Sequence, residues 1–163
     1  MVDTVARNLE IDKSKLVTHV DSPKKRYLLH YGEAFRYEPL PVGTRVIYPP
    51  PPLPAIEDVD AAIEHALANP LGSDPLSALL RPGMKVTIAF DDISLPLPPM
   101  KRPDSRQSVI EKVLAKLADA GVEDIHLIAA LGLHRRMTPG ELKGAVGKKV
   151  LKAFYPDRLY NFD

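Results

Sequence analysis

The stretch MKVTIAFDDISLPLPPMKRPDSRQSVIEKVLAKLADAGVEDIHLIAAL, residues 84–131, contains the pattern that decides the fold. Its first part, Met84–Phe90, is short, β-branched and mostly apolar, which is typical of a strand buried on both faces of a parallel sheet. An amphipathic helix is predicted over Ser105–Ala120, and Gly121 suits the C′ position at its end. Asp124–Ala130 reads as a second buried strand. Strand, helix and strand in this order predict a right-handed βαβ unit with adjacent or near-adjacent parallel strands.

Two polar loops follow these strands, and a parallel sheet carries its functional residues at the carboxyl ends of its strands. Asp92 lies in the loop after the first strand, and His134 lies in Gly132–Arg135 after the second. We therefore expect an acid and a histidine to converge at one edge of the sheet. The alternatives are an aspartate that caps a turn before Pro96 and an exposed loop histidine. Arg135 is either a residue that recognises a carboxylate or phosphate, or a solvated side chain.

Helices and strands alternate on both sides of this unit. Residues 56–69 and 74–81 predict two further helices, the first with an apolar face. Thr138, Pro139 and Glu141 form a capping-box sequence that begins a helix after the second loop. The predicted fold class is α/β, built from βαβ units with a mainly parallel sheet and helices on its faces.

The first 54 residues differ in composition, because they are rich in aromatic residues and proline. Tyr27–Tyr31 and Thr44–Tyr48 predict short strands separated by turns. The prolines from 49 to 52 offer no backbone N–H to a sheet and predict an extended connection. We expect residues 1–54 to form an extended and β region that packs on the domain. Residues 55–163 are expected to form the α/β domain, as the first part of a longer catalytic domain.

The composition excludes several classes of protein and site. The 163 residues carry a formal net charge of +1 without a long basic run, which gives no field for nucleic acid. No apolar run is long enough to span a membrane, and the N-terminus does not resemble a signal peptide. Without cysteine there is no thiolate metal site, and His19, His30 and His65 lack the spacing of metal ligands. We predict a cytoplasmic protein that has no membrane or nucleic-acid partner and no metal site of its own.

Two longer stretches carry a resemblance to a known family. ALANPLGSDPLSALLRPGMKVTIAFDDISLPLPPM (66–100) and AGVEDIHLIAALGLHRRMTPGELKGAVG (120–147) resemble the N-terminal domain of the nickel-dependent lactate racemases. That family is marked by an Asp-x-Thr-Arg-Pro loop and a Gly-Thr-His-Arg loop, each after a strand, and related loops occur here in the same order. The resemblance extends from about Tyr27 to the end of the chain.

Both loops depart from the pattern of the family. The first reads Asp92-Ile93-Ser94-Leu95-Pro96, so that a leucine replaces the arginine that in the family helps to hold the substrate carboxylate. The second reads Gly132-Leu133-His134-Arg135, which keeps the histidine that matches a catalytic acid/base of the family. Asn161-Phe162-Asp163 stands where the family tends to carry Asn-His-Asp. The family's cofactor-tethering lysine and second catalytic histidine are expected beyond the end of this chain.

The resemblance implies a racemase or epimerase that acts on a small 2-hydroxy acid, in a cleft shared with a C-terminal domain of the same or a companion chain. It also implies a nickel-pincer nucleotide as cofactor: a histidine takes the hydroxyl proton while hydride passes to the cofactor. On this basis His134 and Asp92 are predicted to be catalytic, and Ser94, Leu95 and Arg135 to contact the substrate. No residue is assigned to the cofactor. The leucine at position 95 predicts a preference other than lactate, and the isolated chain is expected to be inactive and to bind no nickel tightly.

Two other functions stay open on the sequence. Leu95 and Phe162 are also compatible with a binding or scaffold domain that has kept the fold and lost the chemistry. The predicted helix start at Thr138 is a weaker candidate for a phosphate-binding module, because helix N-termini bind anions but no glycine-rich cradle precedes it.

Overall fold

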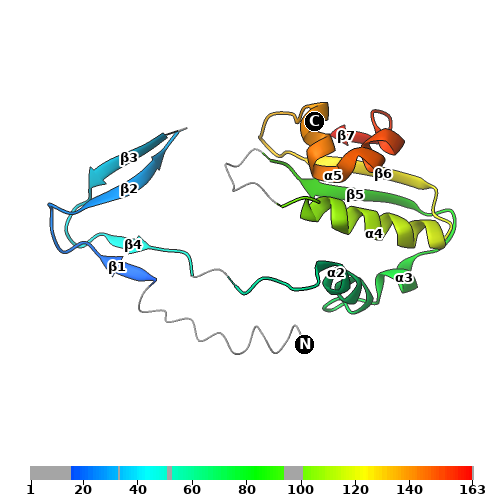
Figure 1. The fold of residues 1–163 in the computed structure, drawn as a ribbon, viewed down its shortest axis with the longest axis horizontal. Coiled ribbons are helices and arrows are strands. Elements are labelled where there is room, and N and C mark those ends of the chain that lie inside the picture. Colours follow the sequence, from blue (N-terminus) through cyan, green and yellow to red (C-terminus); the bar gives the residue numbers. More distant parts are fainter. Residues whose placement is uncertain (1–15, 33, 51–52, 94–100, 163) are drawn as a thin grey trace. The chain divides into compact units, whose positions relative to one another are not determined.

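The computed structural model describes residues 16–32, 34–50, 53–93 and 101–162. The chain divides into two compact units, Met1–Ala55 and Ile56–Asp163. Each unit has its own helices or strands, which Figure 1 shows. The predicted substrate contacts Ser94 and Leu95 lie outside the described residues.

The first unit contains two small antiparallel sheets. β1 (Val17–His19) pairs with β4 (Arg45–Ile47), and β2 (Arg26–Tyr31) pairs with β3 (Ala34–Pro39). Most side chains of the β2–β3 hairpin are exposed. Aromatic and cationic pairs across the strands replace a core there, since the rings of His30 and Phe35 lie 5.4 Å apart and the Arg36 guanidinium lies 3.9 Å from the ring centre of Tyr31. The two predicted strands correspond to β2 and β4, whereas β1 and β3 were not predicted.

The second unit is the α/β part of the chain. Its elements, in order, are α2 (Val59–Ala68), α3 (Leu76–Leu79), β5 (Lys85–Asp91), α4 (Ser105–Asp119), β6 (Asp124–Ala130), α5 (Pro139–Phe154) and β7 (Leu159–Asn161). The three strands form one parallel sheet in the order β5-β6-β7, and Figure 1 shows them side by side with α4 running along the sheet. The predicted α/β class, and the parallel pairing of the two strands joined by α4, are confirmed.

The core of this unit lies on one face of the sheet. Phe90, Leu127 and Leu159 point into a cluster that includes buried residues of both α4 and α5. Because right-handed crossovers between neighbouring parallel strands put successive helices on the same side, α4 and α5 contact each other over that face. On the opposite face, Thr87 and Ala89 are exposed.

Two predicted burial patterns are therefore wrong. The segment Met84–Phe90 was expected to be buried on both faces, but in β5 exposed side chains alternate with partly buried or buried ones because both helices cover the same face. α2 was expected to bury an apolar stripe, yet none of its residues is buried, and Ile56 precedes the helix. The contacts of α2 with α4 include ion pairs: Lys112 lies 3.3 Å from Asp60, and Lys116 lies 2.8 Å from Glu64.

α5 begins as the sequence predicts and bends where it was not predicted to. The Thr138 hydroxyl accepts from the backbone N–H of Glu141, and the Glu141 carboxylate accepts from the backbone N–H of Thr138, which completes a capping box. Gly147 interrupts the helix with φ 84° and ψ 159°, a conformation that glycine alone adopts readily. Two helical segments therefore meet at a kink at Gly147.

None of the helices in the described ranges has both the length and the apolar composition needed to cross a bilayer.

Candidate active site

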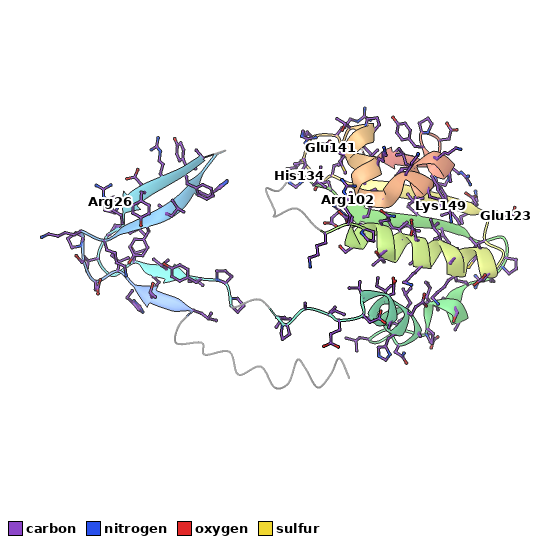
Figure 2. All side chains as sticks on the ribbon, in the orientation of Figure 1. Arg26, Arg102, Glu123, His134, Glu141 and Lys149 are labelled. Atoms are coloured by element: carbon purple, nitrogen blue, oxygen red, sulfur yellow. The ribbon has the colours of Figure 1, made fainter. Side chains whose placement is uncertain are left out.

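The site lies at the carboxyl ends of β5 and β6. The two strands pair in register up to Asp91 and Ala130, so the loops that begin with Asp92 and Leu131 leave the sheet at the same level. Figure 2 shows His134 and Glu141 at this end of the unit and Glu123, which precedes β6, at the other end. This is the edge where parallel sheets carry their functional side chains.

Asp92 and His134 are in contact across the two loops. The His134 Nδ1 atom lies 3.1 Å from Oδ2 and 3.3 Å from Oδ1 of Asp92. The Asp92 side chain is 9% exposed and the His134 side chain is 45% exposed. A carboxylate that faces Nδ1 favours the neutral ring protonated at that atom, and the basic nitrogen of this tautomer is Nε2.

The His134 loop is held at both ends. Leu131 and Met137 are buried, and the backbone N–H of His134 donates to the carbonyl of Leu131 in a turn through Gly132, which has φ 58°. The side chain of Asn161, at the end of β7, accepts from the backbone N–H of Met137 at 2.9 Å and donates to its carbonyl at 3.0 Å. These contacts fix the two ends of the loop on either side of His134.

The Asp92 loop is held by the start of α4. Nη1 of Arg106 donates to the carbonyls of Asp91 and Asp92, at 2.9 and 2.8 Å. The same guanidinium donates through Nε and Nη2 to the two carboxylate oxygens of Asp104, at 2.9 and 2.8 Å. The hydrogen bonds from Arg106 lower the pKa of Asp104, and Asp104 in turn raises the pKa of Arg106. Both side chains are 11% exposed, so this ion pair is a sheltered one.

Arg135 lies beside the site and is bound to α5. Its Nη1 and Nη2 atoms donate to the two carboxylate oxygens of Glu141, at 3.0 and 2.8 Å. The hydrogen bonds from Arg135, and after them the one from the backbone of Thr138, lower the pKa of Glu141 to about 2. Arg135 therefore ties the end of the His134 loop to the capping box of α5.

The structure brings together three of the five residues singled out in the sequence. Asp92 and His134 touch, Arg135 lies next to them, and Ser94 and Leu95 fall outside the described residues. The supporting residues Asp104, Arg106 and Asn161 were not predicted. Asp104 carried one usable signal, because an aspartate before an amphipathic helix is a favoured N-cap, and its carboxylate does accept from the backbone N–H of Arg106. The role of Arg106 at Asp91 and Asp92 has no local signal, because these carbonyls lie 14 or more residues away. Asn161 was noted in the sequence only as part of Asn161-Phe162-Asp163, and its contact with Met137, 24 residues away, was not predicted.

The residues of the site do not build a metal centre by themselves. Among the described residues, no group of three or more histidine, cysteine, aspartate or glutamate side chains is placed to hold a metal ion. The site supplies one imidazole, His134, whose Nδ1 faces Asp92. Another histidine of the sheet, His126, contacts Tyr160 and Asp124 on the uncovered face, away from the two loops. This donor set does not fit a nickel-containing cofactor without ligands from elsewhere.

Comparisons with known proteins bear on the fold and the family of the chain. No curated protein matches the chain. The solved lactate racemase apoprotein from Thermoanaerobacterium thermosaccharolyticum has a similar fold, with a TM-score of 0.52 and 19% sequence identity over 85% of this chain. The chain spans 30% of the length of that protein.

The family model of the lactate racemase N-terminal domain matches residues 31–163. This range includes the whole α/β unit, both loops of the site and the helix starts that hold them. The chain belongs to the lactate racemase N-terminal domain family.

Proposed function

We propose that this chain is the N-terminal domain of a racemase or epimerase that acts on a 2-hydroxy acid, with His134 as a proton-transfer residue. The observation that carries the proposal is the contact of 3.1 Å between the sheltered Asp92 carboxylate and the accessible His134 imidazole. It supports proton transfer because a carboxylate that accepts from Nδ1 fixes the ring and leaves Nε2 to take the proton.

In the proposed reaction, Nε2 of His134 takes the proton of the substrate hydroxyl and later returns it. Asp92 holds the ring and stabilises the imidazolium that forms. This chain thus contributes proton transfer at one defined atom, Nε2 of His134. Histidine suits this role because its side chain titrates near neutrality.

The cofactor implied by the resemblance is a nickel-pincer nucleotide, which would supply the hydride chemistry. The described donor set does not form a site for it, so no step of the proposal depends on it. We propose that the cofactor and its tether come from the rest of the racemase, in the same or a companion chain. The proposed cytoplasmic location is a further prediction from the sequence.

Substrate recognition is proposed to differ from that of a lactate racemase. Leu95 cannot donate to a carboxylate, whereas an arginine contributes about 1.5–3 kcal/mol through charge-assisted hydrogen bonds. Arg135 is the proposed replacement, with Ser94 as a second contact. The bonds of Arg135 to Glu141 and to the carbonyl of Arg136 use its Nη1 and Nη2 atoms, and its Nε–H is a donor that these bonds do not use.

The test is a substitution in the assembled holoenzyme, with this chain and the remaining domain present. His134→Ala is expected to abolish racemisation while cofactor content and fold are unchanged. His126→Ala is the matched control, because it removes a histidine from the same sheet outside the site and is expected to leave the turnover number within about twofold. Turnover of His134→Ala at the wild-type rate would exclude the mechanism and favour a scaffold domain.

Leu95→Arg tests the specificity half of the proposal in the same assembly. It is expected to raise kcat/KM for small 2-hydroxy acids relative to larger ones, because it restores a carboxylate-binding cation. Efficient lactate racemisation by the protein with its own Leu95 would contradict the proposed preference and leave the role of His134 intact.

A further inference from the structure

Arg106 makes contacts that the start of a helix does not require. The cap of α4 is complete without its guanidinium, since the Asp104 carboxylate accepts from the backbone N–H of Arg106. The guanidinium nevertheless reaches out of the helix and donates to two consecutive carbonyls, those of Asp91 and Asp92. Residue 92 is the one whose carboxylate touches His134.

Binding a substrate carboxylate does not explain this arginine. Four of its five N–H groups already donate to Asp104, Asp91 and Asp92, and its side chain is 11% exposed. A substrate anion would have to displace Asp104, whose two oxygens fill one side of the fork. Arg106 is therefore committed to protein atoms.

We propose that Arg106, held by Asp104, is a positioning residue that aims the Asp92 carboxylate at His134 and so sets the tautomer of the catalytic imidazole. The inference rests on the proposed function for its consequence in catalysis. Two carbonyls bound by one rigid guanidinium fix the orientation of the peptide units on both sides of Asp92, and with them the direction of its side chain. Asp92 then selects the neutral ring protonated at Nδ1, which leaves Nε2 as the base.

The tautomer of His134 can be measured in the 163-residue chain without any turnover. Nitrogen-15 NMR of the histidine rings at high pH distinguishes rings protonated at Nδ1 from rings protonated at Nε2. For wild-type His134 we expect the Nδ1–H form to dominate. Arg106→Lys keeps a positive charge but lacks the planar fork of the guanidinium. This variant is expected to lower the ratio of the Nδ1–H form to the Nε2–H form of His134 by about tenfold, which corresponds to the loss of one charge-assisted hydrogen bond.

Asp104→Asn is a second variant that preserves folding, because asparagine is also a good N-cap. Its amide N–H₂ opposes Nη2 of Arg106, so the guanidinium should shift and the tautomer ratio should fall in the same direction. Arg158→Gln is the control. Arg158 lies over the ring of Phe154 and donates to the Ala153 carbonyl, away from both loops, and its loss should leave the ratio unchanged.

The outcomes separate the proposal from its alternatives. An unchanged tautomer ratio in folded Arg106→Lys and Asp104→Asn chains would overturn it, and would reduce Arg106 to a structural role. A changed ratio supports it even if the holoenzyme proves to have another activity. In an active holoenzyme, Arg106→Lys should lower kcat with little change in KM, whereas a rise in KM alone would contradict positioning through Asp92.

Discussion

The side chains of Asp92 and His134 differ in their exposure to solvent. The carboxylate is 9% exposed and faces the protein, and the imidazole is 45% exposed and faces outward. A carboxylate in this position acts on the ring and has little access to a substrate. Its removal should therefore affect the chemical step more than substrate binding.

Asp92→Asn is expected to lower kcat of the assembled enzyme by about 10²–10⁴-fold, with a small change in KM. The amide can donate to Nδ1 and so favours the tautomer protonated on the wrong nitrogen. Steady-state kinetics measures the effect. Asp91→Asn, one residue earlier and exposed at the end of β5, is the matched control and should stay near wild type. Equal losses in both variants would mean that charge at this edge, rather than the contact with His134, matters.

The lowered pKa of Glu141 leads to a prediction about how stability depends on pH. Arg135 lowers its pKa from an ordinary 4.5 to about 2, so the charged form is favoured in the folded state. The stabilisation is fully present above about pH 4.5 and is lost as pH falls towards about 2. Glu141→Gln should therefore lower the urea midpoint at pH 7, and the difference from wild type should shrink between these values. Glu123→Gln, an exposed control, should show no such pH-dependent difference.

At the scale of elements, local patterns predicted the βαβ core closely. β6 has the predicted bounds, β5 and α4 differ by one residue, and the capping box of α5 is present. These signals are local because a cap, a C′ glycine and an apolar period act within a few residues. β1 was missed because it depends on pairing with β4, a segment far along the chain. β3 pairs with the neighbouring strand β2, and nearly all of its side chains are exposed, so burial leaves little pattern in its sequence. The apolar period of α2 correctly indicated a helix, but none of its residues is buried.

The bend in α5 gives a prediction for two glycines of one helix. Gly147→Ala is expected to destabilise the chain by about 1–3 kcal/mol, because φ 84° and ψ 159° are strained for any residue with a side chain. A new methyl would also lie 2.5 Å from the side chain of Gln107, which can move aside.

Gly144→Ala is the control within the same helix. Its added methyl meets no atom within 4 Å, and alanine is the better helix former, so this variant should be neutral or up to about 1 kcal/mol more stable. Urea unfolding of both variants measures the difference. Equal stability of the two would show that the bend is not needed.

At the scale of the whole molecule, the site could be predicted only in part. Topology alone brings the ends of β5 and β6 together, which is why Asp92 and His134 were named in advance. The supporting roles of Arg106 and Asn161 could not be predicted, because each acts on the backbone of a residue far away in the chain. The order of side chains along a sequence does not show which carbonyl a distant arginine will contact.

The division of the chain gives a prediction about folding. Every residue of the main core cluster lies within Ile56–Asp163, and none lies in the first unit. Residues 56–163 produced alone should therefore unfold cooperatively, with a urea midpoint close to that of the full chain. A non-cooperative transition or a large loss of stability would show that the α/β unit needs the first 55 residues, and would also count against the domain boundary predicted near residue 55.

The two loop supports share a property that bears on how such a site diversifies. Arg106 holds the carbonyls of Asp91 and Asp92, and Asn161 holds the N–H and carbonyl of Met137. Every residue except proline presents these same backbone groups, so neither support depends on the side chains that the loops display. Leu133, in the loop of His134, is fully exposed and is an example of a loop side chain on which neither support depends. Mutation can alter what the loops recognise while the pair of Asp92 and His134 stays in place, so under the proposed function new substrates become accessible without rebuilding the proposed base.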